Sequence, residues 1–91
     1  MHYKILTTES YFKKITKFLK KHPDMFDRYI KTMKTLEGNP YHPSLRLHKL
    51  TGNMGEYYSI SLNLQYRVII DFIIKEDEII PIDIGTHDAV Y

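Results

Sequence analysis

The sequence predicts an α+β fold in the order β-α-α-β-β-β, with a helical hairpin packed on one face of a mainly antiparallel four-stranded sheet. Two observations support this class. Apolar residues recur every three or four positions up to about residue 38, and they alternate after residue 56. The two helical stretches are separated by only a residue or two, which favours a hairpin. With 91 residues, the chain has room for one core, so residues 1–91 are predicted to form a single domain.

The first two elements follow from local signals. Residues 2–6 alternate and predict a short strand, and residues 7–9 supply N-cap candidates and an acidic first turn. The helix is expected to end at residues 20–22, where two lysines and a histidine suit the negative end of the helix dipole. Its apolar stripe consists of Phe12, Ile15 and Leu19, flanked by Tyr11 and Phe18.

The second helix is expected to begin at Pro23, a residue suited to the first helical position, and to stop at Gly38, with Pro40 preventing continuation. One face of this helix carries Phe26, Tyr29, Ile30, Met33 and Leu36. Both apolar stripes contain aromatic residues. We interpret them as core packed against the sheet, because such stripes usually form core rather than a ligand site.

Three strands follow a proline-rich loop and a turn-rich break. They are predicted at residues 56–63, at residues 66–74 and in the isoleucine-rich stretch around Pro81, which places that last strand at an edge or a bulge. If the even-numbered apolar residues share the helix-covered face, the short turn at residues 63–65 sets Ser61 opposite Arg67. The next hairpin then sets Arg67 opposite Gly85 or His87.

Composition excludes several classes of protein. There is no cysteine, so disulfides and thiolate metal sites are excluded. Neither a signal peptide nor an apolar run of membrane-spanning length is present, and a cytoplasmic protein without membrane contact is expected. Charge is unevenly distributed: residues 1–50 carry eleven Lys/Arg against four Asp/Glu (+7), and residues 51–91 carry two against seven (−5). The basic half can attract a polyanion, although its lysines could equally be the solvated face of a helix.

The predicted register brings together residues with useful chemistry. Arg67 can hold a phosphate through two parallel hydrogen bonds, His87 can exchange a proton near neutral pH, and Tyr91 can stack on an unpaired base. Such a set would suffice for RNA cleavage without a metal, in which a base takes the 2′-OH proton and an acid protonates the leaving 5′-oxygen. The alternative is a structural ion pair of Arg67 with a nearby aspartate: Asp71, Asp83 or Asp88.

A metal site would have to use His42, His48 and His87 with an aspartate. Their spacing matches no tight ligand motif, so neither a metal nor another cofactor is expected.

Three blocks resemble the RelE/ParE superfamily of toxins, with the RelE and YafQ branches closest: residues 47–52 (LHKLTG), 65–70 (QYRVII) and 85–91 (GTHDAVY). The resemblance spans essentially the whole chain. It implies the toxin of a bacterial type II toxin–antitoxin system, which cleaves mRNA in the ribosomal A site without a metal. A cognate antitoxin would hold it inactive in a hetero-oligomer.

The resemblance also implies roles for individual residues. Arg67 falls on a phosphate-binding arginine, His87 on a YafQ-type histidine and Tyr91 on a terminal aromatic that stacks on the substrate. His48 matches a YafQ-type histidine that can serve as a second acid or base. We expect substrate and ribosomal RNA to contact a set of cations: Arg46, Lys49, Lys13, Lys17 and Lys20.

One departure from the RelE pattern keeps other functions open. Where RelE carries alternating lysines, this chain has Ser59 and Ser61. The phosphate would then depend on Arg67, assisted by Lys49 or Arg46. A ParE-like toxin that inhibits DNA gyrase without cleaving RNA is one alternative, against which the His87–Tyr91 ending argues. A catalytically silent antitoxin-binding module is another.

Overall fold

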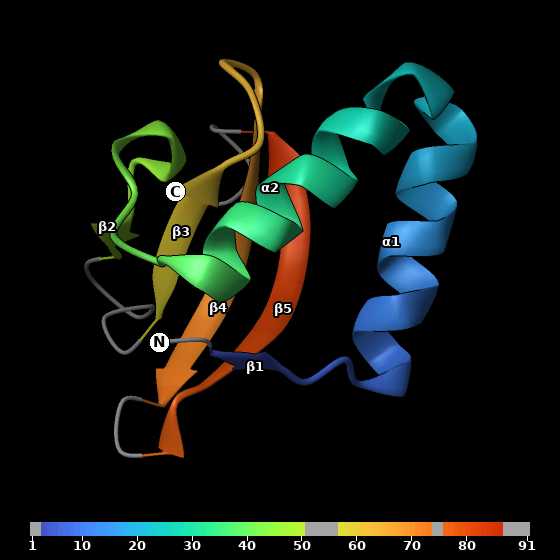
Figure 1. The fold of residues 1–91 in the computed structure, drawn as a ribbon. Coiled ribbons are helices and arrows are strands. Elements are labelled where there is room, and N and C mark those ends of the chain that lie inside the picture. Colours follow the sequence, from blue (N-terminus) through green and yellow to red (C-terminus); the bar gives the residue numbers. More distant parts are fainter. Residues whose placement is uncertain (1–2, 51–56, 74–75, 87–91) are drawn as a thin grey trace.

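The computed structural model describes residues 3–50, 57–73 and 76–86 (Figure 1). Its elements in chain order are β1 (Lys4–Ile5), α1 (Glu9–Lys21), the 3₁₀ turn η1 (Pro23–Met25), α2 (Phe26–Gly38), the 3₁₀ turn η2 (Pro43–Leu45), β2 (His48–Lys49), β3 (Tyr58–Ser61), β4 (Tyr66–Ile73) and β5 (Glu78–Thr86). No helix in these described ranges has the length and apolar character needed to cross a membrane.

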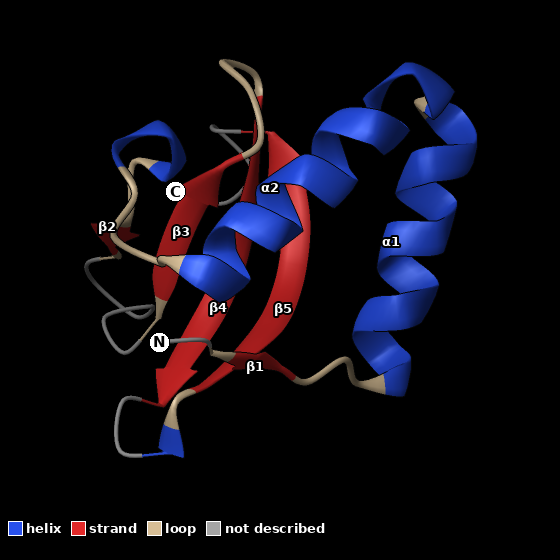
Figure 2. Cartoon of the chain, viewed as in Figure 1, coloured by secondary structure: helices blue, strands red, loops and turns tan. Residues whose placement is uncertain are grey.

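The predicted α+β class is confirmed. The sheet has the order β1-β5-β4-β3-β2, in which β1 runs parallel to β5 and all other neighbours are antiparallel. It therefore contains a fifth strand beyond the four that were predicted. That strand is β2, which has only two residues and so carries no alternating pattern in the sequence. Both helices lie on the same face of the sheet (Figure 2).

The helix boundaries follow from capping groups. The side chain of Thr8 accepts a hydrogen bond of 3.1 Å from the backbone N–H of Tyr11, which makes Thr8 the N-cap of α1. Pro23 begins the 3₁₀ turn η1 rather than α2 itself, and this turn leads directly into α2. Helix α2 ends at Gly38, and the backbone N–H of Asn39 donates to the carbonyl of Thr35 at 2.8 Å.

The main core lies between the helices and the sheet. Its buried members are Tyr11, Ile15, Leu36, Leu45, Ile60, Val68, Ile70 and Ile79. The expectation that the whole of both aromatic stripes is core was wrong: the side chains of Phe12, Phe26 and Ile30 are 60%, 51% and 38% exposed. Successive helical residues point about 100° apart, so Tyr11 and Phe12 cannot both face the sheet. Tyr11 takes the inward position, with 1% exposure.

The predicted strand register is confirmed on both sides of Arg67. Its Cα partners are Ser61 on β3 and Gly85 on β5. Towards the start of β5 the pairing shifts by one residue, since Ile69 pairs with Asp83 but Ile70 pairs with Pro81. Ile82 is thus the extra residue of a β-bulge.

The bulge changes which face the β5 side chains occupy. Ile79 belongs to the core beneath the helices, whereas Ile82 packs with Leu50 and Ile69 in a second, smaller cluster. Ile69 alternates with the core residue Val68, so this second cluster lies on the face away from the helices. The predicted bulge at Pro81 is confirmed, but the expectation that Ile82 faces the helices was wrong.

Candidate functional site

Arg67 is the second residue of the middle strand, β4, and has a strand on each side. Its side chain is half-buried, and its guanidinium nitrogen Nη1 is buried. Because β4 alternates, Arg67 projects from the face opposite the core residue Val68 and thus away from the helices. A guanidinium held in this way presents its remaining N–H groups in a fixed direction, which suits bidentate contact with a phosphate.

The serines beside Arg67 are inaccessible to solvent. Ser59 is 0% exposed and Ser61 is 9% exposed, and the hydroxyl of Ser61 donates a 2.8 Å hydrogen bond to the carbonyl of Asn63. These are the positions at which the RelE pattern has lysines. A long cationic side chain would not fit here without displacing the atoms that cover Ser59. The small residues are therefore part of the packing around Arg67.

Strand β2 brings His48 onto the Arg67 face. His48 pairs with Ser59, and Ser59 pairs with Ile69 on β4, so these three residues share one side of the sheet. His48 is exposed. It lies two strands from β4, which corresponds to about 10 Å across the sheet. The role of His48 as an acid or base stays a prediction.

The neighbouring cation Lys49 lies on the other face. Lys49 pairs with Tyr58, whose side chain packs against the core beneath the helices. Because directly opposed residues share a face, Lys49 points away from the side that carries Arg67. Both Lys49 and Arg46 are exposed. Arg46 precedes β2 and has a left-handed backbone conformation, with φ 49° and ψ 49°.

The C-terminal residues of the predicted site, His87 and Tyr91, lie outside the described residues. The last described residue is Thr86, which pairs with Tyr66, the neighbour of Arg67 on β4. The proposed roles of His87 and Tyr91 remain predictions.

The lysines of α1 occupy a different part of the molecule. Lys13, Lys17 and Lys20 are all exposed, and Figure 1 shows α1 on the opposite side of the molecule from β2. Lys13 forms an exposed ion pair of 3.6 Å with Glu9. Such pairs contribute little to stability, so this lysine is available to an external anion at small cost.

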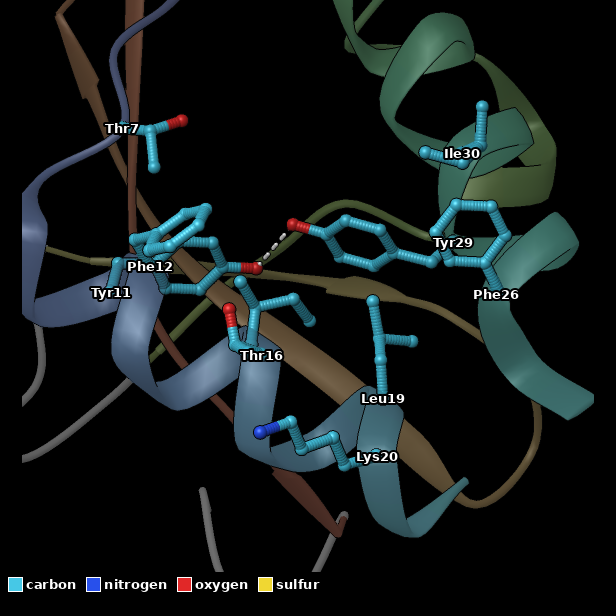
Figure 3. Close-up of a pocket in the computed structure, with 10 residues that line it drawn as sticks. Thr7, Tyr11, Phe12, Thr16, Leu19, Lys20, Phe26, Tyr29 and Ile30 are labelled. Atoms are coloured by element: carbon cyan, nitrogen blue, oxygen red, sulfur yellow. Dashed lines mark hydrogen bonds between the residues drawn. The ribbon is translucent and has the colours of Figure 1, made fainter. Parts of the chain in front are cut away.

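Apolar residues that were expected in the core instead line a groove between α1 and α2, which we call the interhelical groove (Figure 3). It has a volume of about 500 Å³ and is lined by Thr7, Tyr11, Phe12, Ile15, Thr16, Leu19, Lys20, Phe26, Tyr29 and Ile30. The exposed rings of Phe12 and Phe26 contribute to its walls. Exposed apolar surface gathered in one groove is typical of a contact site for another protein.

Two tyrosines meet inside this groove. The hydroxyl oxygens of Tyr11 and Tyr29 lie 2.7 Å apart, as the dashed line in Figure 3 shows. Burial raises the pKa of Tyr11 far above its ordinary value, and the neighbouring Tyr29 raises it further. Burial also raises the pKa of Tyr29, although its hydrogen bond with Tyr11 lowers it. Both phenols therefore stay neutral near physiological pH, and the pair acts as a structural link between the helices.

The metal alternative gains no geometric support. Within the described ranges, no three His, Cys, Asp or Glu side chains lie close enough to hold an ion together. The ring nitrogen Nδ1 of His42 instead accepts a hydrogen bond of 3.1 Å from the backbone N–H of Ser44 and lies 2.8 Å from its hydroxyl.

Sequence reasoning missed two cations that line a second, polar hollow beside β3: Arg28 and Lys31 of α2. Their spacing of three residues puts them on one face of a helix, which is the signal that could have revealed them. The hollow also contains His42 and Ser61, so it reaches the strand that pairs with Arg67.

Comparison with known proteins identifies the fold. No protein-family model matches the chain, and no curated protein matches it. Among solved structures, it is similar to YafQ from E. coli strain BL21(DE3), with a TM-score of 0.77, 20% identity and 98% of each chain covered. The toxin in the E. coli DinJ–YafQ toxin–antitoxin complex matches with a TM-score of 0.76 and 19% identity, covering 100% of this chain and 99% of that one.

A YoeB/ParE toxin from Agrobacterium tumefaciens matches with a TM-score of 0.73 and 15% identity, covering 92% of this chain and 98% of that one. At these identities the likeness shows the fold. The chain has the fold of these toxins over nearly its whole length.

Proposed function

We propose that this chain, which has the fold of the YafQ toxin, is the toxin of a type II toxin–antitoxin pair and cleaves mRNA on the ribosome without a metal ion. The observation that carries the proposal is the placement of Arg67. It is half-buried near the start of the central strand β4, faces away from the helices and shares that face with His48. This is the arrangement that a phosphate-centred reaction requires.

The proposed reaction divides the work among four side chains. The guanidinium of Arg67 binds the scissile phosphate and stabilises the negative charge that develops on it. One of the two histidines, His48 or His87, removes the proton from the 2′-OH, and the 2′-oxygen attacks phosphorus. The other histidine protonates the leaving 5′-oxygen as the P–O bond breaks, leaving a 2′,3′-cyclic phosphate. Tyr91 stacks on the base of the substrate nucleotide and holds it in position.

The ribosome contact is assigned to the exposed cations. Lys13, Lys17 and Lys20 on α1 would bind ribosomal RNA at one side of the molecule, and Arg46 and Lys49 would do so at the other. Phosphate contacts of this kind position a protein on RNA without reading its sequence.

The antitoxin contact is assigned to the interhelical groove. Its exposed rings offer apolar anchoring sites, and Lys20 lines the groove. An amphipathic helix of the antitoxin, with an apolar row and acidic flanking residues, matches both properties. DinJ–YafQ is a toxin–antitoxin complex of the same toxin fold, which supports a protein partner of this type. The toxin and its antitoxin would form a hetero-oligomer.

Induced expression followed by mapping of mRNA 5′ ends tests the proposal. The unaltered chain should produce new 5′ ends at in-frame positions, and Arg67→Ala should abolish both these ends and the growth arrest while antitoxin binding survives. Arg67→Lys keeps the charge but loses the planar fork, so its cleavage should be much weaker than that of the unaltered chain. Lys34→Ala, an exposed change on α2, is the matched control that should cleave normally.

The buried serines at positions 59 and 61 favour one second candidate, a gyrase-inhibiting toxin that does not cleave RNA. In that case mRNA would stay intact and DNA damage would appear. A chain without any growth effect would be a silent antitoxin-binding module. Either result would exclude the nuclease.

The acid–base assignment has its own test. Replacing His48 with glutamine should remove one limb of the pH dependence of cleavage, because that limb reports the ionisation of an essential acid or base. A His48→Gln variant with an unchanged pH profile would remove His48 from the mechanism.

A further inference from the structure

A polar groove lies beside the end of β3, between this strand, α2 and the turn η2. It consists of two hollows of about 550 and 390 Å³ that share Arg28, Ser44, Ser61 and Leu62. Lys31 lines the first hollow and Arg46 lines the second. We call the two together the cationic groove.

The groove carries excess positive charge. Arg28, Lys31 and Arg46 line it, and Asp27 is the only carboxylate among its lining residues. All three cations are exposed, and none forms an ion pair with any residue that the structure describes. Their charge is therefore available to a ligand. Three such cations within a concave surface attract a polyanion more strongly than the same charges spread over a flat one.

The backbone of Arg46 supplies an independent observation. It adopts the left-handed conformation at the end of the turn η2, with φ 49°. Glycine or asparagine would adopt this conformation at lower cost than arginine does. Arg46 holds this conformation while its side chain lines the groove.

The lining also provides neutral donors. Because Nδ1 of His42 accepts the N–H of Ser44, the neutral ring carries its proton on Nε2. Thr32 contributes a hydroxyl to the same hollow, whereas the hydroxyl of Ser44 donates to Nδ1 of His42 at 2.8 Å. Arginine, lysine and hydroxyl side chains are common contacts of phosphate and sugar oxygens.

The groove adjoins the candidate active site. Ser61 lines both hollows and is the direct Cα partner of Arg67. Arg67 itself projects from the opposite face of the sheet, so an RNA strand that contacts both Arg67 and the groove would pass around the end of β3.

We propose that the cationic groove binds the sugar–phosphate backbone of an RNA strand, through Arg28, Lys31 and Arg46. The inference rests on the proposed function, because the groove would hold another part of the RNA that the toxin acts on. An acidic peptide is a poorer match, since peptides need apolar anchors in addition to charge. Of the apolar lining residues, Leu45 and Leu62 are each only 2% exposed, and Leu64 is the single exposed one, at 88%.

The salt dependence of RNA binding tests the proposal. The probes are a labelled 12-nucleotide single strand with 2′-O-methyl groups, which cannot be cleaved, and an A-form RNA hairpin, which represents ribosomal RNA. Binding is followed by fluorescence anisotropy between 50 and 300 mM salt. For the single strand, Arg28→Gln, Lys31→Gln and Arg46→Gln should each weaken binding and lower the slope of log K against log salt by about 0.7. Lys34→Gln, an exposed lysine of α2 outside the groove, should leave the slope unchanged.

A slope that changes for either probe supports the groove and identifies the kind of RNA it holds. Slopes that are unchanged for both probes in all three variants would overturn the proposal. It would also be overturned if an oligoglutamate peptide bound with the same sensitivity to the three substitutions while RNA binding showed none.

This outcome is independent of the nuclease test. Arg67→Gln should abolish cleavage yet keep the contribution of the groove to the salt slope. If the three groove variants lower the slope but no mRNA is cut in cells, the groove stands and the nuclease proposal fails.

Discussion

The hydroxyls of Tyr11 and Tyr29 lie 2.7 Å apart and form the polar link between α1 and α2. The ring of Tyr11 is almost completely buried, and burial raises the pKa values of both phenols above their ordinary value of 10. The geometry of the interhelical groove therefore depends on the protonation state of these two phenols.

We predict that Tyr29→Phe lowers the free energy of unfolding by about 1 kcal/mol at pH 7, because the Tyr11 hydroxyl loses its partner. The two phenols ionise near pH 10 in the unfolded chain but only at higher pH in the folded one. Their contribution to stability is therefore complete below about pH 10 and is lost as the pH rises beyond it. The variant should lose less stability than the unaltered chain between pH 9 and 11. Urea denaturation across this range measures both effects, and Tyr57→Phe, outside the pair, should match the unaltered chain.

Restoring a RelE-type lysine should harm this chain. Ser59 is 0% exposed, so Ser59→Lys would either bury an ammonium group or displace the atoms that cover it. We expect a loss of about 2 kcal/mol or more in unfolding free energy, without a gain in RNA cleavage. Thermal or urea denaturation provides the measurement. Gln65→Lys, at an exposed turn position, should change stability by less than about 0.5 kcal/mol. A stable and more active Ser59→Lys protein would contradict the proposed packing around Arg67.

Phe12 offers a test of the interhelical groove. Its side chain is 60% exposed, so Phe12→Ala should change the free energy of unfolding by less than about 0.5 kcal/mol. The affinity for the antitoxin should fall about tenfold or more, which corresponds to about 1.4 kcal/mol. Isothermal titration with the purified antitoxin checks this. The control is Leu64→Ala, which removes an apolar side chain that is 88% exposed and lies outside the interhelical groove. Equal affinity of both variants would exclude the groove as the antitoxin contact.

Arg46→Gly should separate stability from binding. The left-handed conformation costs a non-glycine residue about 1–2 kcal/mol, and glycine loses about 0.4–1 kcal/mol more through the entropy of the unfolded chain. The unfolding free energy should therefore rise by roughly 0.5–1 kcal/mol while RNA binding weakens. Arg28→Gln, on a regular helix, should weaken RNA binding without the gain in stability. An Arg46→Gly protein that is more stable and binds RNA normally would show that this arginine is not needed in the groove.

Much of the sheet could be predicted from sequence because local constraints determine it. The turn between β3 and β4 is short, and Oδ1 of Asn63 accepts hydrogen bonds from the backbone N–H groups of Gln65 and Tyr66. A turn of known length, together with alternation on both strands, leaves one register, and this places Ser61 beside Arg67.

The remaining features depend on contacts that no local pattern contains. The rotation of α1 about its own axis could not be predicted from the sequence, because Tyr11 and Phe12 are both aromatic. Only packing decides which of the two faces the sheet. His48 could be named from the family pattern, but its face depends on β2 pairing with Ser59, a contact between strands too short to leave a periodic signal. In the sequence, Arg28 and Lys31 look like ordinary cations on a helix surface. Only the folded structure shows that the turn η2 lies beside them and completes a hollow.

The extra residue Ile82 also affects how this strand can be aligned with those of other toxins. Side chains alternate between the two faces of the sheet on both sides of the bulge, but the extra residue shifts this alternation by one position. The isoleucines before and after the bulge therefore do not all point to the same face. A relative without the bulge would have one residue fewer in this strand. If the two sequences were aligned on their isoleucines without a gap, Gly85 would be matched to the wrong residue of the relative. Gly85, which pairs with Arg67, is therefore a better anchor for transferring residue roles than the isoleucine run.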